Sequence, residues 1–188
     1  LVGANAGDAL TTGSTSVVIG VHAMTTEDVG SQSTAVGHYA MEKQNTASAG
    51  NTYNTGIGTY AGRYNVTGTN NTYVGHKAGK GASGNSNSDN TGVGRDALLN
   101  ITDGGSNTAI GTFAGSSITT GDYNVMLGRS AGAATTDVDN AVVIGYAAAN
   151  ANMTDGADGT VAIGASALNA LTSGARNLAI GHGAMDAL

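Results

Sequence analysis

The chain contains no cysteine, no proline and no tryptophan, and only 11% of its 188 residues are charged. Without cysteine there is no disulfide framework, so the composition fits an oxidising or a reducing compartment equally well. A collagen helix is excluded because the 31 glycines do not fall at every third position and proline is absent. No run approaches the ~20 apolar residues of a membrane span, so we expect no membrane insertion.

Charge of positive sign is also scarce. Seven lysine and arginine residues oppose thirteen aspartate and glutamate residues, which gives a net charge of −6. A nucleic-acid partner is therefore not expected, because a phosphate-binding surface requires clustered lysine and arginine. Disorder is not expected either, since apolar residues recur in a fixed register along the whole chain.

The dominant feature is a repeat. Eleven times a hydrophobic residue precedes a glycine that is followed three residues later by alanine, and the glycines stand at Gly3, Gly20, Gly37, Gly58, Gly75, Gly94, Gly111, Gly128, Gly145, Gly164 and Gly181. Most intervals are 17 residues, with insertions of two or four. Such a short fixed period with β-prone residues predicts a parallel β-solenoid.

We therefore predict an all-β fold of about eleven 17-residue coils, with residues 1–188 forming a single repeat array. The pattern is already under way at Val2 and still continues at Ala184. Because solenoids usually carry atypical terminal coils, we expect this array to be a segment of a longer fibre protein.

One coil illustrates the expected geometry. Thr108 to Ile110 form a short strand, Gly111 makes the corner, and Ala114 points into a narrow interior. Asparagine stands four residues before the glycine in five successive coils, and stacked amides there would hydrogen-bond along the rod at the ~4.8 Å strand repeat. We assign them a structural role: Asn54, Asn71, Asn90, Asn107 and Asn124.

The strands carry no charge on either side. We expect the first and third residues of each strand triplet to face the interior and the middle one to face outward. The middle residues are uncharged: Val18, Ala35, Gly56, Tyr73, Gly92, Ala109, Met126, Val143, Ala162 and Ala179. A water-exposed strand face would carry polar residues, so this face should pack on another chain in a homotrimer. The alternative is a monomer covered by another domain.

The Asn107-Thr-Ala-Ile-Gly, Ala-Gly and Thr-Thr-Gly elements resemble the repeats of trimeric bacteriophage tail fibres and are similar to the head repeats of trimeric autotransporter adhesins. The resemblance implies a left-handed β-roll, three chains about one axis, and a place in the tail fibre of a virion. Its implied partners are other fibre proteins and a host cell-surface glycan or protein. The 17-residue period favours the viral fibre over the alternative, an adhesin head on a bacterial cell surface.

Three aspartates share one position, six residues before their glycines: Asp122, Asp139 and Asp158. Carboxylates stacked ~5 Å apart repel one another unless a cation lies between them or they point into water. The sequence leaves both interpretations open, calcium binding and solvated corners. His38, His76 and His182 each follow a glycine, and we expect them at the surface.

Tyr39 and Tyr60 share a position two residues after their glycines and should stack. An exposed aromatic ladder could bind the sugar rings of a host glycan, and packing between chains is the alternative. No enzyme activity and no cofactor other than calcium are expected. No serine has histidine and aspartate at a suitable offset, and Glu27 and Glu42 belong to different coils.

An ice-binding or ligand-binding solenoid is a further alternative. Ice binding needs a flat, outward array of threonine, and threonine does recur at Thr34, Thr55, Thr72, Thr91 and Thr108. We rank it lower because these positions adjoin the face assigned to chain contact.

Overall fold

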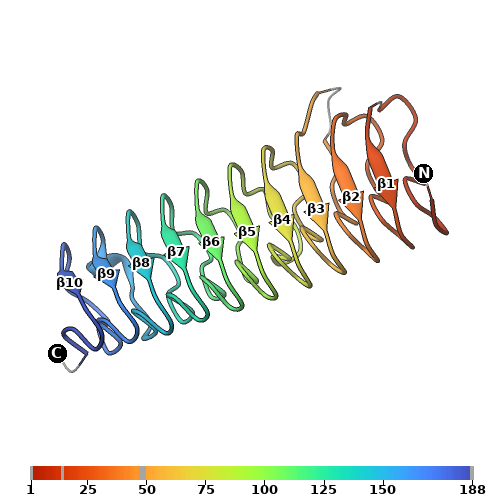
Figure 1. The fold of residues 1–188 in the computed structure, drawn as a ribbon. Coiled ribbons are helices and arrows are strands. Elements are labelled where there is room, and N and C mark those ends of the chain that lie inside the picture. Colours follow the sequence, from red (N-terminus) through yellow and green to blue (C-terminus); the bar gives the residue numbers. More distant parts are fainter. Residues whose placement is uncertain (1, 14, 47–49, 187–188) are drawn as a thin grey trace.

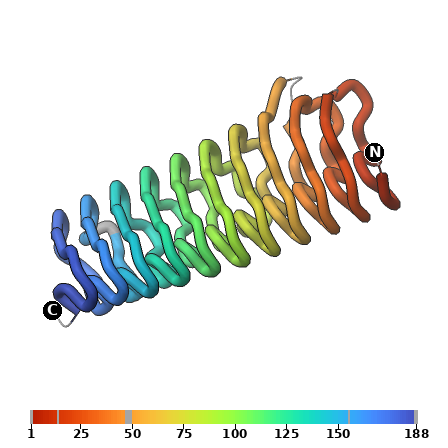
Figure 2. Tube along the Cα trace, viewed as in Figure 1, coloured from red at the N-terminus to blue at the C-terminus, as the bar shows by residue number. Residues whose placement is uncertain are grey.

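The computed structural model describes residues 2–13, 15–46 and 50–186, which form an elongated rod of stacked coils (Figure 1). Figure 2 shows the chain winding in one sense from one end of the rod to the other. Within the described residues each strand has three residues: β1 (Val17–Ile19), β2 (Thr34–Val36), β3 (Thr55–Ile57), β4 (Thr72–Val74), β5 (Thr91–Val93), β6 (Thr108–Ile110), β7 (Val125–Leu127), β8 (Val142–Ile144), β9 (Val161–Ile163) and β10 (Leu178–Ile180). A short 3-10 helix (η1, Asp155–Ala157) precedes β9.

The ten strands form one parallel sheet in chain order. Equivalent residues pair, as Thr34 does with Thr55 across the four-residue insertion between β2 and β3. The predicted parallel β-solenoid is therefore confirmed. The first of the eleven sequence repeats contributes only a bridge from Val2 to Ile19, so the described chain has ten strands instead of eleven. None of its helices is long and apolar enough to cross a membrane.

The predicted direction of the strand side chains is wrong. The middle residue of every strand is buried, and the first and third residues lie partly or largely exposed. The interior is too narrow for two columns of branched side chains. The middle column instead carries mostly alanine and glycine, and the asparagine two residues before it also points inward, as strand alternation requires.

Large interior side chains are matched by glycines. Tyr73 is fully buried, and Gly56 and Gly92 occupy its position in the neighbouring strands. A Cβ on Gly92 would lie 3.0 Å from the Tyr73 ring, and one on Gly79 would overlap it. The rod therefore keeps a constant width, because each bulky residue occupies space that its neighbours leave open.

The corner after each strand requires glycine. Gly20 has φ +130°, and a Cβ there would lie 2.5 Å from the carbonyl oxygen of Gly37 in the next coil. No other residue combines that backbone conformation with such a close approach. The column of glycines thus brings successive coils together at the strand repeat.

Candidate functional site

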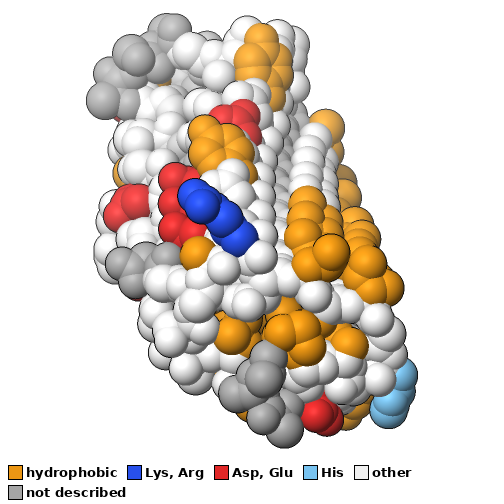
Figure 3. Space-filling view, turned by 90° about the vertical axis from the view of Figure 1, so that its left-hand side faces the viewer, with side chains coloured by type: hydrophobic (Ala, Val, Ile, Leu, Met, Phe, Trp, Pro, Cys, Tyr) orange, Lys and Arg blue, Asp and Glu red, His pale blue; other side chains and the backbone are white. Residues whose placement is uncertain are grey.

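The outward side of the ten-stranded sheet is a regular surface along the rod. We call it the sheet face and define it by the first and third residues of the ten strands. Its third residues are all branched aliphatic and partly exposed, with Ile57 at 40% and Ile110 at 44%. They form one column along the rod: Ile19, Val36, Ile57, Val74, Val93, Ile110, Leu127, Ile144, Ile163 and Ile180. Figure 3 shows a band of hydrophobic side chains along one side of the molecule.

The first residues form a second column that changes character along the rod. Threonine occupies it from β2 to β6, at Thr34, Thr55, Thr72, Thr91 and Thr108. Valine or leucine occupies it from β7 to β10, at Val125, Val142, Val161 and Leu178. Val17 occupies this column in β1, so the sheet face is half polar from β2 to β6 and wholly apolar from β7 to β10.

The asparagine ladder holds each strand start in register with the next. The N–H of Asn124 donates to Oδ1 of Asn107 (3.0 Å), and Nδ2 of Asn107 donates to the carbonyl of Gly121 (2.8 Å). The same pattern runs through all five predicted positions, Asn54, Asn71, Asn90, Asn107 and Asn124, and every one is buried. The predicted stacking is thus confirmed, mainly through side-chain to backbone bonds.

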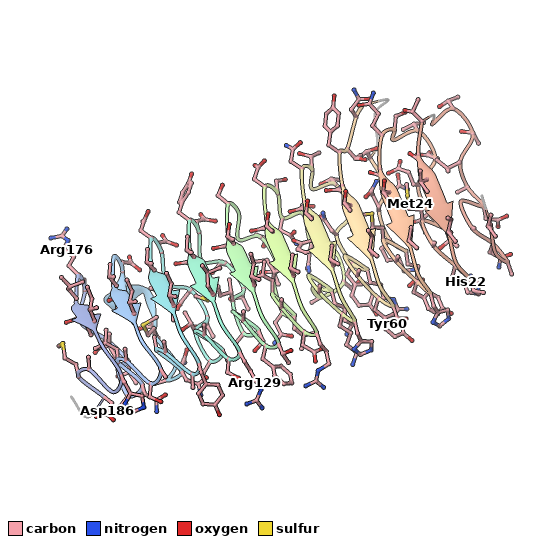
Figure 4. The ribbon with its side chains drawn as sticks, in the orientation of Figure 1. His22, Met24, Tyr60, Arg129, Arg176 and Asp186 are labelled. Carbon is pink, nitrogen blue, oxygen red and sulfur yellow. The ribbon has the colours of Figure 1, made fainter. Side chains whose placement is uncertain are left out.

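An aromatic edge borders the sheet face where the strands end. Tyr39 and Tyr60 stack at 5.6 Å with an angle of 10°, and His22 stacks on Tyr39 at 4.9 Å (Figure 4 labels His22 and Tyr60). The predicted stack is confirmed. Because Tyr39 lies between His22 and Tyr60, its ring faces are occupied, and an incoming sugar would meet ring edges and hydroxyls. Both tyrosines are half-buried.

Arg63 contacts both tyrosines of this edge. Its guanidinium lies 4.7 Å from the Tyr39 ring centre and 4.9 Å from that of Tyr60, and its Nε donates to Glu42. Burial would raise the pKa of Glu42, but hydrogen bonds and charge from Lys43 and Arg63 outweigh it and hold that pKa below its usual range. Glu42 therefore stays ionised and fixes the arginine over the rings.

Basic residues continue along the same edge. Arg95 lies 4.4 Å from the Phe113 ring centre, and Arg129 lies 5.5 Å from that of Tyr146. His38, His76 and His182 are exposed, as predicted. Of the seven lysine and arginine residues, six lie within six residues after a strand-ending glycine: Lys43, Arg63, Lys77, Lys80, Arg95 and Arg129. Figure 4 shows Arg129 on this edge and Arg176, the exception, on the opposite one.

The opposite edge, where the strands begin, is acidic. Asp122, Asp139 and Asp158 are half-buried, and each accepts a backbone N–H from the preceding coil. Gly105 donates to Asp122 (2.6 Å), Asp122 to Asp139 (2.7 Å), and Asp139 to Asp158 (2.9 Å). These charge-assisted bonds stabilise the stack by protein contacts. Among the described residues no three histidine, cysteine, aspartate or glutamate side chains lie close enough to hold a metal ion.

Sequence reasoning missed one polar cluster in the interior. Glu27 is fully buried, and its carboxylate accepts hydrogen bonds from the Gly30 N–H (2.7 Å), from Gln44 Nε2 (3.1 Å) and from Thr46 Oγ1 (3.1 Å). Because these donors come from different coils, only the folded arrangement shows that they meet. No sequence signal distinguishes Glu27 from a surface residue.

No pocket is found in the described part of the chain. The candidate surfaces are the sheet face and the two edges. Comparison with protein-family models, with curated proteins and with solved structures finds no match.

Proposed function

We propose that this chain is a structural segment of a virion tail fibre, in which three copies pack through their sheet faces and support or perform attachment to a host cell surface. The observation that carries the proposal is the exposed, uncharged sheet face. Contiguous apolar patches larger than a few hundred Å² are rare on monomers and mark interaction surfaces.

The regularity of the sheet face supports a homo-oligomer. Ten rungs at ~4.8 Å give a surface more than ~40 Å long that presents similar side chains at every level. A second and third copy can use every rung at once, because they carry the same spacing. The resemblance to trimeric fibre repeats favours three chains over two.

Side chains two or more residues beyond the corner glycines, such as Tyr39 and Tyr60, would lie at the outer border of such an assembly and remain accessible there. We place contact with a host glycan or protein on the aromatic edge around Tyr39 and Tyr60, where Arg63 adds positive charge. Other fibre proteins are the further partners. We propose no catalytic role. The head of a bacterial surface adhesin is the alternative with the same geometry, and a membrane anchor in the same gene would favour it.

Ice binding is a second candidate that the structure makes stronger than the sequence did. The threonines at 34, 55, 72, 91 and 108 face outward in a flat column beside Val36, Ile57, Val74, Val93 and Ile110. The reason for ranking it low was a wrong side-chain direction. It requires a free sheet face, so thermal hysteresis by a stable monomer would support it over the fibre.

The test is the molar mass in solution by light scattering, with and without a calcium chelator. We expect three times the chain mass of 18.3 kDa. Ile110→Lys places a charge in the middle of the sheet face and should shift the mass toward one chain, because an unpaired charge is costly to bury. Thr120→Lys, at an exposed corner, should leave the mass unchanged. A wild-type monomer at all concentrations would refute the fibre proposal.

A further inference from the structure

Two rims of opposite charge border the sheet face. The basic rim consists of Arg95 and Arg129, which directly follow the glycines after β5 and β7 and are exposed. The acidic rim consists of Asp89 and Asp122, which lie five and six residues before the corresponding glycines, at the start of the same two strands. Asp89 is exposed and Asp122 is half-buried.

The charges of one rung cannot neutralise each other within a chain. Asp89 and Arg95 are six residues apart along an extended segment, which separates them by ~20 Å. Their contacts within the chain are weak or local. Arg95 Nε lies 3.7 Å from Asp96, and Asp89 accepts a hydrogen bond from Asn70 Nδ2 at 3.1 Å. The Arg95 guanidinium also packs over the Phe113 ring. Asp89 and Arg95 are both exposed, so each can still pair with a charge on a neighbouring molecule.

The relative direction of two copies decides which rims meet. When copies are related by rotation about an axis parallel to the rod, the strand-end rim of one lies beside the strand-start rim of the next, so basic meets acidic. When two rods run in opposite directions face to face, each rim meets its own kind. Unlike charges attract and like charges repel, so the rims favour parallel copies.

The positions of the charges also select the register. At equal height, Arg95 of one copy meets Asp89 of its neighbour, and Arg129 meets Asp122, because each pair belongs to one rung. A shift by one rung places Arg95 opposite the neighbour's Asn70 or Ser106 instead. Arg129 would still meet Asp139 after a shift in one direction, so the pair of Arg95 with Asp89 selects the register.

The composition of the sheet face independently favours parallel copies in register. Parallel copies in register place the valine and leucine of β7 to β10 against each other and keep threonine with threonine from β2 to β6. Opposite directions would place the apolar half against threonine hydroxyls, which lose water without gaining partners.

We propose that the two rims fix neighbouring copies parallel and in register, through ion pairs of Arg95 with the neighbour's Asp89 and of Arg129 with the neighbour's Asp122. The proposal rests on the proposed oligomeric fibre and adds what determines its direction and alignment.

A charge swap tests the ion pair. Arg95→Glu and Asp89→Arg should each raise the concentration at which half of the oligomer dissociates by roughly tenfold, because each rim contact contributes up to ~1 kcal/mol and recurs at every interface. The double variant should restore the wild-type value. Arginine fits at position 89, because Arg176 occupies the equivalent site with φ 60° against 62° for Asp89. Lys80→Glu is the charge-matched control, because Lys80 lies over the Tyr64 ring of its own chain.

Cross-linking tests direction and register. Because the chain has no cysteine, Thr55→Cys and Ile57→Cys in β3 and Val142→Cys in β8 each introduce one thiol on the sheet face. Parallel copies in register predict links of residue 55 to 57 in a mixture of those two variants, because the start of each strand lies beside the end of the same strand in the neighbour. Opposite directions predict links of residue 55 to 142 in a mixture of the two variants, because those rungs are equally far from the two ends of the sheet.

The outcomes separate the two proposals. A monomer at all concentrations overturns both the fibre and the rims. If either single substitution leaves the dissociation concentration unchanged, or if the double variant does not restore the wild-type value, the proposed ion pairs are wrong. The proposal of an oligomeric fibre would still stand. Links of residue 55 to 142 also overturn the parallel arrangement. Restoration by the double variant together with links of residue 55 to 57 supports it.

Discussion

At the scale of single residues, the interior is specific in a way that the repeat pattern conceals. Tyr73 occupies a position where other coils have alanine, glycine, valine or methionine, and its hydroxyl donates to Asn87 Oδ1 at 2.6 Å. The ring fits only because the surrounding positions are glycine. The coil of Tyr73 therefore depends on a side-chain hydrogen bond as well as on a size match with glycines.

Tyr73 gives a prediction for alkaline pH. Burial raises the pKa of Tyr73 well above the usual value of 10.0 for a tyrosine. Because the unfolded chain loses this proton first, the stability contributed by the neutral phenol is complete below pH 10 and is lost as the pH rises further. Alkaline titration followed by absorbance should show one tyrosine ionising together with the loss of circular dichroism.

Tyr73→Phe is the matched variant. It should lack this coupled ionisation step, and at neutral pH it should be less stable by ~1–2 kcal/mol, because Asn87 Oδ1 loses its hydroxyl donor. Ionisation of all seven tyrosines without any loss of structure would contradict the predicted environment.

At the scale of elements, the three-residue strand is too short to form alone, so its flanks define it. The asparagine before the strand and the glycine after it fix its ends, and hydrogen bonds to the next coil hold it in the sheet. The ladder ends where Ala141 replaces asparagine, yet the Ala141 N–H still donates to Asn124 Oδ1 at 2.9 Å. Each amide thus serves the coil that follows it.

Asn107→Ala tests the ladder. The substitution leaves the buried Asn124 N–H and Gly121 carbonyl without their partner, which should cost ~2–3 kcal/mol in urea unfolding. Hydrogen exchange should accelerate in β6 and β7. Asn100→Ala, at an exposed site, should change neither measurement. Equal stability of the two variants would show that the ladder contributes little.

The sequence predicts the positions of the strands and corners well. It predicts poorly which side chains of each strand face the interior. The glycine period places the strand residues, the corners and the stacks of asparagine and tyrosine, because equal offsets become equal heights in a solenoid. It does not show which side of a three-residue strand faces inward, since Thr-Ala-Ile can be read either way. Asp122 accepts a backbone N–H from the preceding coil, and Glu27 accepts hydrogen bonds from the side chains of Gln44 and Thr46 in the next coil, which composition does not reveal.

At the scale of the whole molecule, each coil contacts mainly its neighbours, so the rod behaves as a stack of near-equivalent units. The parallel register passes unchanged across insertions of two and four residues. Rods of different lengths can therefore form with this architecture, provided that whole coils are added or removed.

Removal of residues 111–127, one 17-residue period, tests this independence. Ile110 would then precede Gly128, and β6 would pair with β8 in the same register. We expect a shorter rod with native-like circular dichroism and cooperative thermal unfolding. Removal of residues 111–118 alone should abolish the fold, because second-corner residues would then follow the strand. Equal damage by both deletions would argue against independent coils.

The change from threonine to valine along the sheet face has a consequence for the order of assembly. Copies that pack through this face would make their strongest contacts between β7 and β10, near the C-terminus, where no hydroxyl must lose water. A ribosome delivers β7 to β10 after β2 to β6. A chain of which only β2 to β6 has been synthesised would therefore expose the more weakly associating part of the sheet face, and oligomers would close from β10 toward β1.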